Sequence, residues 1–506
     1  MKVFLKIVPA MIVTLFLTPS LWAQRDIREA VVKIYTVYNC YDYDEPWKMW
    51  GQERRSGSGC IIRGSRILTS AHVVADQTFI QLRRAGEARK YTAEVQIIGH
   101  ECDLAILTVE DKSFFSGVEP IEIGDLVEVN DTVAVFGFPK GGDKLCITGG
   151  VVSRVEHHKY THSGARLLSC QIDAAINPGA SGGPVIKGDK LVGVAFQGMS
   201  GENIGYMVPT PIITYFLEDI TDGTYHGPPG LGISWQRMEN PDLRLKYGMS
   251  ETQTGVLVNK IYPGSPAEGI LKSEDIILSI DGKNVENDGT VEFRKGERTF
   301  FGYLLQGKFI NDNAAFEILR GKNNLGVVIA LSKPMGFGRL VPYEQYDIAP
   351  TYYIVGGLVF TPLTVNYLKT WKTWYVNAPA DLLNYYYYGE QTDDQKEIVV
   401  LVKVLADEIN VGYHHWENRV ISYVNGERIS TMTDLVRAFE EHKGRYHTVL
   451  DERGYQIVLD RGKVARRSER ILQKYKIGSD RSKDLERSSN DWTRIKLIEE
   501  GMGPVQ

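Results

Sequence analysis

Short runs of β-branched, aliphatic and aromatic residues, separated by turn-forming residues, recur from residue 31 to 210 and indicate an all-β region. A first group of six comprises Val31–Val37, Gly59–Ile62, Arg66–Ser70, Thr78–Leu82, Val95–Gly99 and Leu104–Val109. A second group comprises Thr132–Phe138, Leu145–Val155, Leu167–Ile172, Pro184–Ile186, Leu191–Phe196 and Ile204–Val208. Two groups of six short strands predict two small β-barrels packed together, with Pro211–Ile220 as a closing helix.

A glycine-rich loop with a serine at its centre, Asn177–Pro184, follows the third strand of the second group. Its glycines and flanking prolines are poor material for a helix or a central strand. A tight loop of this kind can present the Ser181 oxygen together with backbone N–H groups that stabilise a negative charge. Taken alone, the segment is equally typical of a surface turn.

Two further residues give this serine a chemical context. His72 comes just after a strand, among small and apolar neighbours, and Asp103 begins the last strand of the first group. Each has an ordinary alternative role, structural histidine or turn former. The order His72, Asp103, Ser181 on a double barrel nevertheless fits a base, its orienting carboxylate and a nucleophile. The loop then supplies oxyanion donors from Gly179 and Ser181, with Ala180 between them.

Three motifs, Thr69–Val74, Cys102–Leu107 and Asn177–Pro184, resemble those of HtrA/Deg (DegP-like) serine endoproteases. The segments Gly57–Gly59 and Asn203–Tyr206 match this family as well. The resemblance implies a mainly β, chymotrypsin-like fold in which His72, Asp103 and Ser181 are catalytic and Gly179, Ala180 and Ser181 form the oxyanion hole. It also implies ATP-independent cleavage of unfolded or damaged proteins, a homotrimer or higher homo-oligomer, and no cofactor or metal. One departure is Ala180, where the family commonly has asparagine.

Two alternatives concern the serine loop. Residues 179–183 also satisfy the G-x-S-x-G pattern of α/β-hydrolases. That fold requires a helix after the serine, whereas strands follow here, so we set it aside. The second alternative is a protease-inactive chaperone or peptide-sensing scaffold, for which Ala180 is the sequence support.

A segment after the linker His226–Gly230 resembles a bacterial-type PDZ domain, on the motifs Gly230–Ile233, Gly264–Leu271 and Glu274–Gly282. Domains of this kind bind a peptide C-terminus by adding it as a strand to a sheet edge. The resemblance implies that Gly230, Leu231, Gly232 and Ile233 receive the terminal carboxylate. The helix across the groove is expected at Phe300–Phe309.

A more diverged copy follows, in which Val420–Glu427 repeats the Ile-Leu-Ser-Ile-Asp-Gly element and Met432–Phe439 is the expected helix. Residues 355–362 resemble the second PDZ domain of plant Deg-type proteases, which implies assembly more than peptide capture. In its loop Gly357–Phe360 a valine replaces the second glycine, which restricts the backbone. Four tyrosines, Tyr385–Tyr388, are either an interface patch or edge packing.

At 506 residues the chain is too long for a single core, and roughly three domains are expected. We place a signal peptide at 1–23, the protease at 24–225, the first PDZ domain at 228–335, the second at 350–462, and a basic tail at 463–506. The signal peptide rests on Lys2 and Lys6 before the apolar run Ile7–Leu17, with cleavage after Ala23. It predicts export, to the periplasm or elsewhere outside the cytoplasm, without a permanent membrane span.

The remaining composition excludes several other functions. A net charge of −5 gives no indication of nucleic-acid binding. Five cysteines leave at least one unpaired, and their spacing suits no metal site. Histidines cluster at His157, His158 and His162 and at His414–His415, but no acidic or cysteine partner lies at ligand spacing, so solvated loops are expected.

Overall fold

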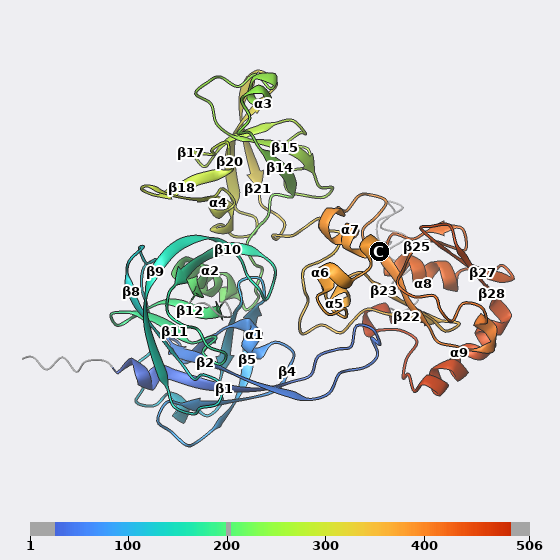
Figure 1. Cartoon of the computed structure of the whole chain (residues 1–506), viewed down its shortest axis with the longest axis horizontal. Helices are drawn as coiled ribbons and strands as arrows, with labels where there is room; N and C mark the ends of the chain where they lie inside the picture. Colours follow the sequence, from blue (N-terminus) through green and yellow to red (C-terminus); the bar gives the residue numbers. More distant parts are fainter. Residues whose placement is uncertain (1–25, 199–203, 487–506) are drawn as a thin grey trace, which may run out of the picture.

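The computed structural model describes residues 26–198 and 204–486 (Figure 1). The expected signal peptide therefore lies outside the described residues. Along the chain follow a double-barrel domain, a middle domain above it in the view of Figure 1, and a C-terminal domain beside them. In the part of the chain that is described, no helix has the length and apolar character needed to cross a bilayer.

The first barrel contains all six strands predicted for it. They close in the order β1-β2-β3-β6-β5-β4. Ile34, Leu68 and Ile106 are fully buried in its interior, as the alternation of apolar residues requires. Its elements are η1 (Ile27–Ala30), β1 (Val31–Tyr38), β2 (Glu53–Ile62), β3 (Arg66–Thr69), α1 (Ala71–Val74), β4 (Gln77–Arg84), β5 (Tyr91–Gly99), β6 (Leu104–Thr108) and η2 (Lys112–Phe115).

The second barrel likewise contains its six predicted strands, in the order β11-β8-β9-β10-β13-β12, and pairing of β11 with β12 closes it. A two-residue strand, β7, adds to β12 in parallel and was too short to predict. The two barrels share one hydrophobic core. The double-barrel prediction is thus confirmed. The elements are β7 (Glu122–Ile123), β8 (Thr132–Gly137), β9 (Cys146–Lys159), β10 (Arg166–Ile172), β11 (Pro184–Lys187), β12 (Lys190–Gly198), β13 (Gly205–Pro209), α2 (Thr210–Asp219) and η3 (Ile220–Asp222).

The middle domain is a sheet of order β14-β15-β16-β20-β21 in which β14 is an edge strand. Its groove helix α4 is shorter than the predicted Phe300–Phe309. Phe300 ends a strand instead, because its ring stacks on Trp235 with centroids 5.7 Å apart, and the helix stops at Gly307. The elements are β14 (Ile233–Arg237), α3 (Pro241–Lys246), β15 (Val256–Ile261), β16 (Ile276–Ile280), β17 (Lys283–Asn284), β18 (Thr290–Arg294), β19 (Glu297–Phe300), α4 (Tyr303–Gln306), β20 (Asn313–Arg320) and β21 (Asn323–Ala330).

The C-terminal domain has the sheet order β22-β23-β24-β25-β27-β28, so β23 is paired on both sides. The basic helix α9 packs on this domain through buried Val464 and Ile471. The elements are β22 (Tyr353–Val355), β23 (Leu358–Pro362), α5 (Val365–Leu368), α6 (Trp374–Asn377), α7 (Ala380–Tyr388), β24 (Val399–Val404), η4 (Glu408–Asn410), β25 (Arg419–Val424), β26 (Glu427–Arg428), α8 (Met432–Glu440), β27 (Tyr446–Asp451), β28 (Gln456–Asp460), α9 (Arg461–Tyr475) and η5 (Lys483–Leu485).

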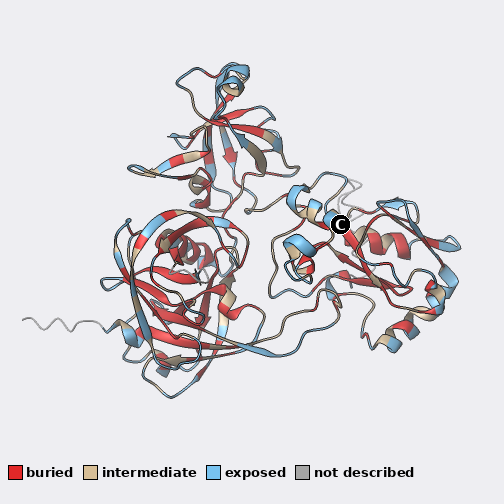
Figure 2. Cartoon of the chain, viewed as in Figure 1, coloured by how far each residue is buried: buried red, intermediate tan, exposed pale blue. Residues whose placement is uncertain are grey.

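Burial distinguishes the domain interiors from one outward-facing helical region. Figure 2 shows buried residues along the barrel strands, whereas α6 and much of α7 are exposed. Within the tyrosine run, Tyr387 and Tyr388 are 54% and 79% exposed, while Tyr385 and Tyr386 are partly buried. The run therefore contributes both to packing and to the surface.

Candidate active site

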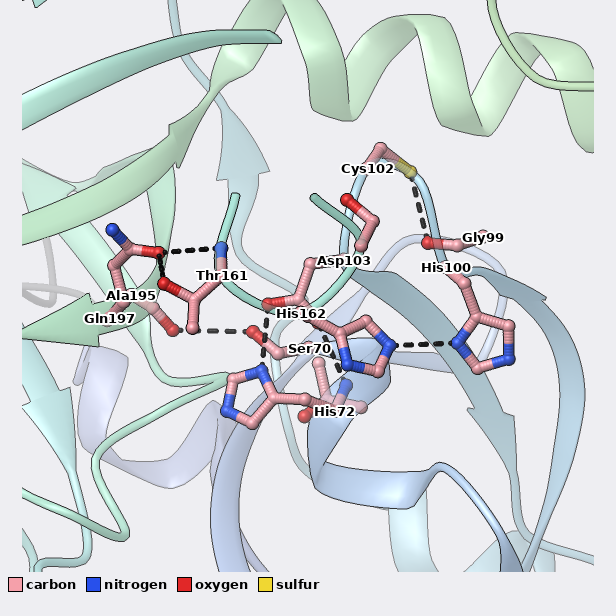
Figure 3. A network of polar contacts seen from close by, with 12 residues as sticks. Ser70, His72, Gly99, His100, Cys102, Asp103, Thr161, His162, Ala195 and Gln197 are labelled. Carbon is pink, nitrogen blue, oxygen red and sulfur yellow. Dashed lines mark hydrogen bonds and ion pairs between the residues drawn. The ribbon is translucent and has the colours of Figure 1, made fainter. Parts of the chain in front are cut away.

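His72 and Asp103 are joined by two hydrogen bonds at the edge of the first barrel (Figure 3). The His72 ring Nδ1 lies 2.8 Å from one carboxylate oxygen of Asp103, and the His72 backbone N–H donates to the other at 2.8 Å. A carboxylate only accepts, so we assign the ring proton to Nδ1. The other ring nitrogen, Nε2, is then left with its lone pair and can act as a base.

The backbone of Asp103 is held in an unusual conformation that aims its side chain inward. Its φ is +53°, in the left-handed region that aspartate tolerates better than most residues. Its N–H donates to the carbonyl of His100 at 3.2 Å, which closes the turn ahead of β6. Burial alone would raise the pKa of Asp103, but the electrostatic interaction with His72 and the hydrogen bonds that His72 donates outweigh burial and lower it. Asp103 is therefore ionised at neutral pH.

The Ser181 loop is braced by Ser58 on β2. The Ser58 Oγ donates to the carbonyl of Gly179 at 2.8 Å and accepts from the N–H of Phe138 at 2.8 Å. The Ser58 N–H donates to the carbonyl of Ser181 itself, also at 2.8 Å. The loop is thus held from the neighbouring strand through the backbone carbonyls on either side of Ala180.

A shared acceptor places this loop beside α1. The carbonyl of Ala195 accepts from the N–H of Gly182 at 2.7 Å and from Ser70 Oγ at 3.4 Å. Gly182 has a φ of +81°, and a Cβ there would lie 2.3 Å from the Ser58 carbonyl oxygen. Only glycine allows this approach, which positions Ser181 next to the helix that carries His72.

Two backbone donors of the loop are unused. Among the described residues, the N–H groups of Gly179 and Ser181 donate to no protein acceptor, whereas the N–H of Ala180 donates to Asn177 at 2.9 Å. Gly179 has a φ of +98°, as expected for a loop that turns N–H groups in one direction. The arrangement offers two donors beside a serine, as stabilisation of an oxyanion requires.

Within the described chain, Ser181 Oγ makes no hydrogen bond to His72. The structure thus joins His72 and Asp103 by hydrogen bonds and places the Ser181 loop beside them. The hydrogen bond between Ser181 Oγ and His72 is not formed. Hydrogen bonds between nucleophile and base are often long without substrate and tighten when substrate binds.

Two histidines, His100 and His162, lie behind this pair. We expected His162 to be solvated, and this expectation is wrong because His162 is buried. His162 Nε2 is 2.9 Å from His100 Nδ1, and the His162 ring is 6.1 Å from that of His72 (Figure 3). Burial lowers the pKa of His162 to about 3, so it is neutral. Its position in a cluster of histidines was visible in the sequence, but its neighbours come from loops far apart along the chain.

A groove of about 560 Å³ runs along the middle domain, between β14 and α4. Leu231, Gly232 and Ile233 line one side, and Phe301 and Leu305 line the other. Gly230 also lines it, but its N–H donates to the carbonyl of Lys333 at 2.9 Å. All four residues predicted to receive a peptide carboxylate therefore lie at this groove.

The middle domain contacts the second barrel through His157 on β9. The His157 Nε2–H donates to Gln306 Oε1 at 2.7 Å, and the ring Nδ1 accepts from the Thr299 hydroxyl at 2.8 Å. Gln306 belongs to the groove helix α4, and its side-chain amide donates to the carbonyl of Arg166 at 3.0 Å. The helix α4, which lines the groove, is thus hydrogen-bonded to the second barrel through Gln306.

This contact predicts that stability falls with acidification. Burial lowers the pKa of His157 from 6.5 to about 4. The stabilising contribution is therefore complete above pH 6.5 and is lost as pH falls from 6.5 to 4. The slope is up to about 1.4 kcal/mol per pH unit for one such group. Chemical denaturation at several pH values should show a shallower decline for His157→Gln. The exposed His415→Gln is the matched control, and an unchanged slope in both variants would contradict the assignment.

Comparison with known families and proteins agrees with this geometry. Residues 57–194 match the trypsin-like peptidase domain, and residues 219–294 and 341–484 match PDZ domains. The chain is 43% identical to Protease Do-like 4, mitochondrial, of Arabidopsis thaliana, over 81% of this chain and 76% of that protein. It is 40% identical to Protease Do-like 2, chloroplastic, of the same plant, over 90% of this chain and 75% of that protein.

A solved structure described as HtrA-type protease AlgW with decapeptide is 23% identical, with a TM-score of 0.47, and covers 60% of this chain and 95% of its own. The two Arabidopsis relatives align with most of this chain. The resemblance recognised in the sequence motifs is therefore confirmed, and the chain belongs to the Do-like (HtrA/Deg) family of serine endopeptidases with two PDZ domains.

Proposed function

We propose that this protein is an ATP-independent endopeptidase that degrades unfolded or damaged proteins, with His72, Asp103 and Ser181 as its catalytic residues. The observation that carries the proposal is the Asp103 carboxylate, which accepts both N–H groups of His72 beside the braced Ser181 loop. That arrangement fixes the imidazole tautomer needed for general-base catalysis.

The proposed reaction follows from which atoms of these groups carry or accept a proton. His72 Nε2 takes the proton of Ser181 Oγ as this oxygen attacks the carbonyl carbon of the substrate. The N–H groups of Gly179 and Ser181 stabilise the resulting oxyanion, with Ala180 as the spacer between them. The imidazolium then protonates the leaving amine, and water repeats the sequence to release the acyl group.

Peptide binding is proposed for the first PDZ domain. Its strand β14 has a free edge, and the loop Gly230–Ile233 opens into the groove. A peptide C-terminus can therefore extend the sheet as one more strand. The second PDZ domain offers no such edge at β23, which favours a role in assembly. We infer a homotrimer or higher homo-oligomer in which exposed Tyr387 and Tyr388 contribute contact surface.

Replacement of Gly232 provides a test of peptide binding. Its φ is +71°, and a Cβ would lie 2.2 Å from the Ser265 side chain. Strain of about 1–2 kcal/mol for an L-residue in this conformation predicts a roughly tenfold or greater rise in Kd for Gly232→Ala. Fluorescence polarisation with a labelled peptide bearing an apolar C-terminus measures it. Gly307→Ala in the same domain, where φ is −88°, should bind normally. Equal affinity of both variants would place the peptide elsewhere.

Delivery out of the cytoplasm is proposed from the N-terminal segment 1–23, whose charge and apolar run fit an export signal. The periplasm is one such destination. An organelle is the other, since the names of the Arabidopsis relatives place those proteins in mitochondria and chloroplasts. Fractionation of cells that express the tagged chain distinguishes the two.

One matched pair of substrates tests the proposed activity. Ribonuclease A in native form and in reduced, carboxymethylated form has the same sequence but differs in folding. Without ATP, the protein should cleave the unfolded form and spare the native one. Binding of the unfolded form without cleavage would instead favour the chaperone alternative. The observations for that alternative are Ala180 and, among the described residues, the lack of a hydrogen bond between Ser181 Oγ and His72.

A further inference from the structure

Residues 336–349, which precede β22, reach the active site through Asp347. One Asp347 carboxylate oxygen accepts the backbone N–H of Asp76 at 2.6 Å, and the other lies 2.9 Å from His100 Nε2. The Asp347 N–H in turn donates to the Asp76 side chain at 2.8 Å. These partners are 271 and 247 residues away along the chain.

The two partners of Asp347 lie on the two loops that carry His72 and Asp103. Asp76 follows α1, the single helical turn that holds His72. His100 begins the turn whose last residue is Asp103. The Asp347 carboxylate, which lies outside the protease domain, therefore connects the loop that carries His72 with the turn that carries Asp103.

Tyr346 strengthens this connection from the same segment. Its ring stacks on His162 with centroids 3.9 Å apart, and its hydroxyl donates to the His162 carbonyl at 2.7 Å. The loop of His162 is fixed in turn to the Asp103 turn, because Ser163 Oγ donates to the carbonyl of Glu101 at 2.9 Å.

The proton positions in this network form a consistent series. The Asp347 carboxylate accepts, so His100 donates through Nε2 and accepts at Nδ1 from the Nε2–H of neutral His162. Figure 3 shows His162 between His72 and His100. Burial alone would raise the pKa of Asp347, but the hydrogen bond from His100 and the electrostatic interaction with this residue lower it, in keeping with an ionised acceptor.

We propose that Asp347 is a positioning residue for catalysis, which holds the loops of His72 and Asp103 at their working separation and makes turnover depend on docking of residues 336–349. The inference rests on the proposed peptidase function. Small displacements are sufficient, since a shift of about 1 Å in a catalytic group can cost on the order of 10² in rate.

The test uses the full chain and the variants Asp347→Ala, Asp347→Asn and Asp394→Ala. Asp394 is an exposed acidic residue of the second PDZ domain, so its variant controls for the loss of charge. The first readout is the rate at which diisopropyl fluorophosphate, a small reagent that needs no peptide subsite, modifies Ser181. Steady-state kcat and KM on one peptide substrate give the second.

We expect Asp347→Ala to lower the modification rate and kcat by about tenfold or more, with KM within twofold of wild type. Asp347→Asn keeps one oxygen for the Asp76 N–H and should have an intermediate effect. Combining Asp347→Ala with His100→Ala should add little, because both act through one contact. Wild-type rates in Asp347→Ala, or an equal loss in Asp394→Ala, would overturn the proposal.

Hydrogen exchange measured by mass spectrometry separates this inference from the proposed function. Asp347→Ala should raise deuterium uptake over residues 70–76 and 99–103, but not across the middle domain, whether or not the protein cleaves substrate. If Asp347→Ala raises uptake but the wild-type protein does not react at Ser181, the peptidase function is rejected and the positioning role of Asp347 still stands. If the wild-type protein reacts at Ser181 but Asp347→Ala leaves uptake unchanged, only the positioning role of Asp347 is rejected.

Discussion

Ser181→Ala lowers kcat for casein by about 10⁶-fold, by analogy with the triad knockouts of another serine protease. The physical reason is the loss of the oxygen that forms the acyl intermediate, while the oxyanion donors Gly179 and Ser181 N–H remain in place. Residual cleavage should therefore exceed the uncatalysed rate by roughly 10³–10⁴. Release of peptides from labelled casein, followed over hours, measures both numbers.

The matched control is Ser113→Ala, a serine of the same domain whose side chain lies outside the site. It should cleave at the wild-type rate. The Ser181→Ala variant should also keep the wild-type melting temperature, because the loop is braced through the backbone carbonyl of residue 181 rather than its hydroxyl. Equal digestion by wild type and Ser181→Ala would mean that another group performs the chemistry.

Asp103→Asn has the second largest expected effect, a fall in kcat of about 10⁴-fold by analogy with the same change in another triad. In this structure the carboxylate accepts two N–H groups of His72, one from the backbone and one from the ring. An amide has a single accepting oxygen. If this oxygen keeps the backbone N–H, the amide nitrogen faces Nδ1 and drives the ring proton to Nε2. The base is then blocked, with little change in volume.

The control for this variant is Asp125→Asn, an exposed residue of the same domain with the same change of charge. It should retain wild-type kcat. Because the amide replaces the carboxylate at nearly constant size, Asp103→Asn should remain folded. Retention of more than a tenth of the activity by folded Asp103→Asn would contradict the assigned tautomer.

Local patterning was sufficient to predict the barrels. Each of the twelve strands alternates or is apolar over a few residues, and turn residues mark its ends, so the periodicity is written in the sequence. The groove helix was predicted too long, because the local sequence places Phe300 in the helix. In the structure Phe300 belongs to β19, where it stacks on Trp235 and pairs with a residue of β18. Such tertiary contacts override local preference.

The residues of the site likewise fall into those that local motifs predict and those that depend on long-range contacts. His72, Asp103 and Ser181 were predicted because short motifs carry them, and glycine requirements such as that at position 182 follow from a positive φ. Ser58 was visible only as part of a matching motif, without its bracing role. Asp347 could not be predicted, since its contacts join residues hundreds of positions apart and depend on how the domains dock.

The covalent adduct of a fluorophosphonate reagent shows directly whether Ser181 is a nucleophile activated by His72. Native protein is treated with the reagent, digested with trypsin and analysed by mass spectrometry, alongside His72→Ala and urea-unfolded protein. We expect one adduct per chain, located on Ser181, and none in the two controls, since the hydroxyl reacts only when His72 accepts its proton. An adduct on another residue, or digestion of casein without any adduct, would contradict it.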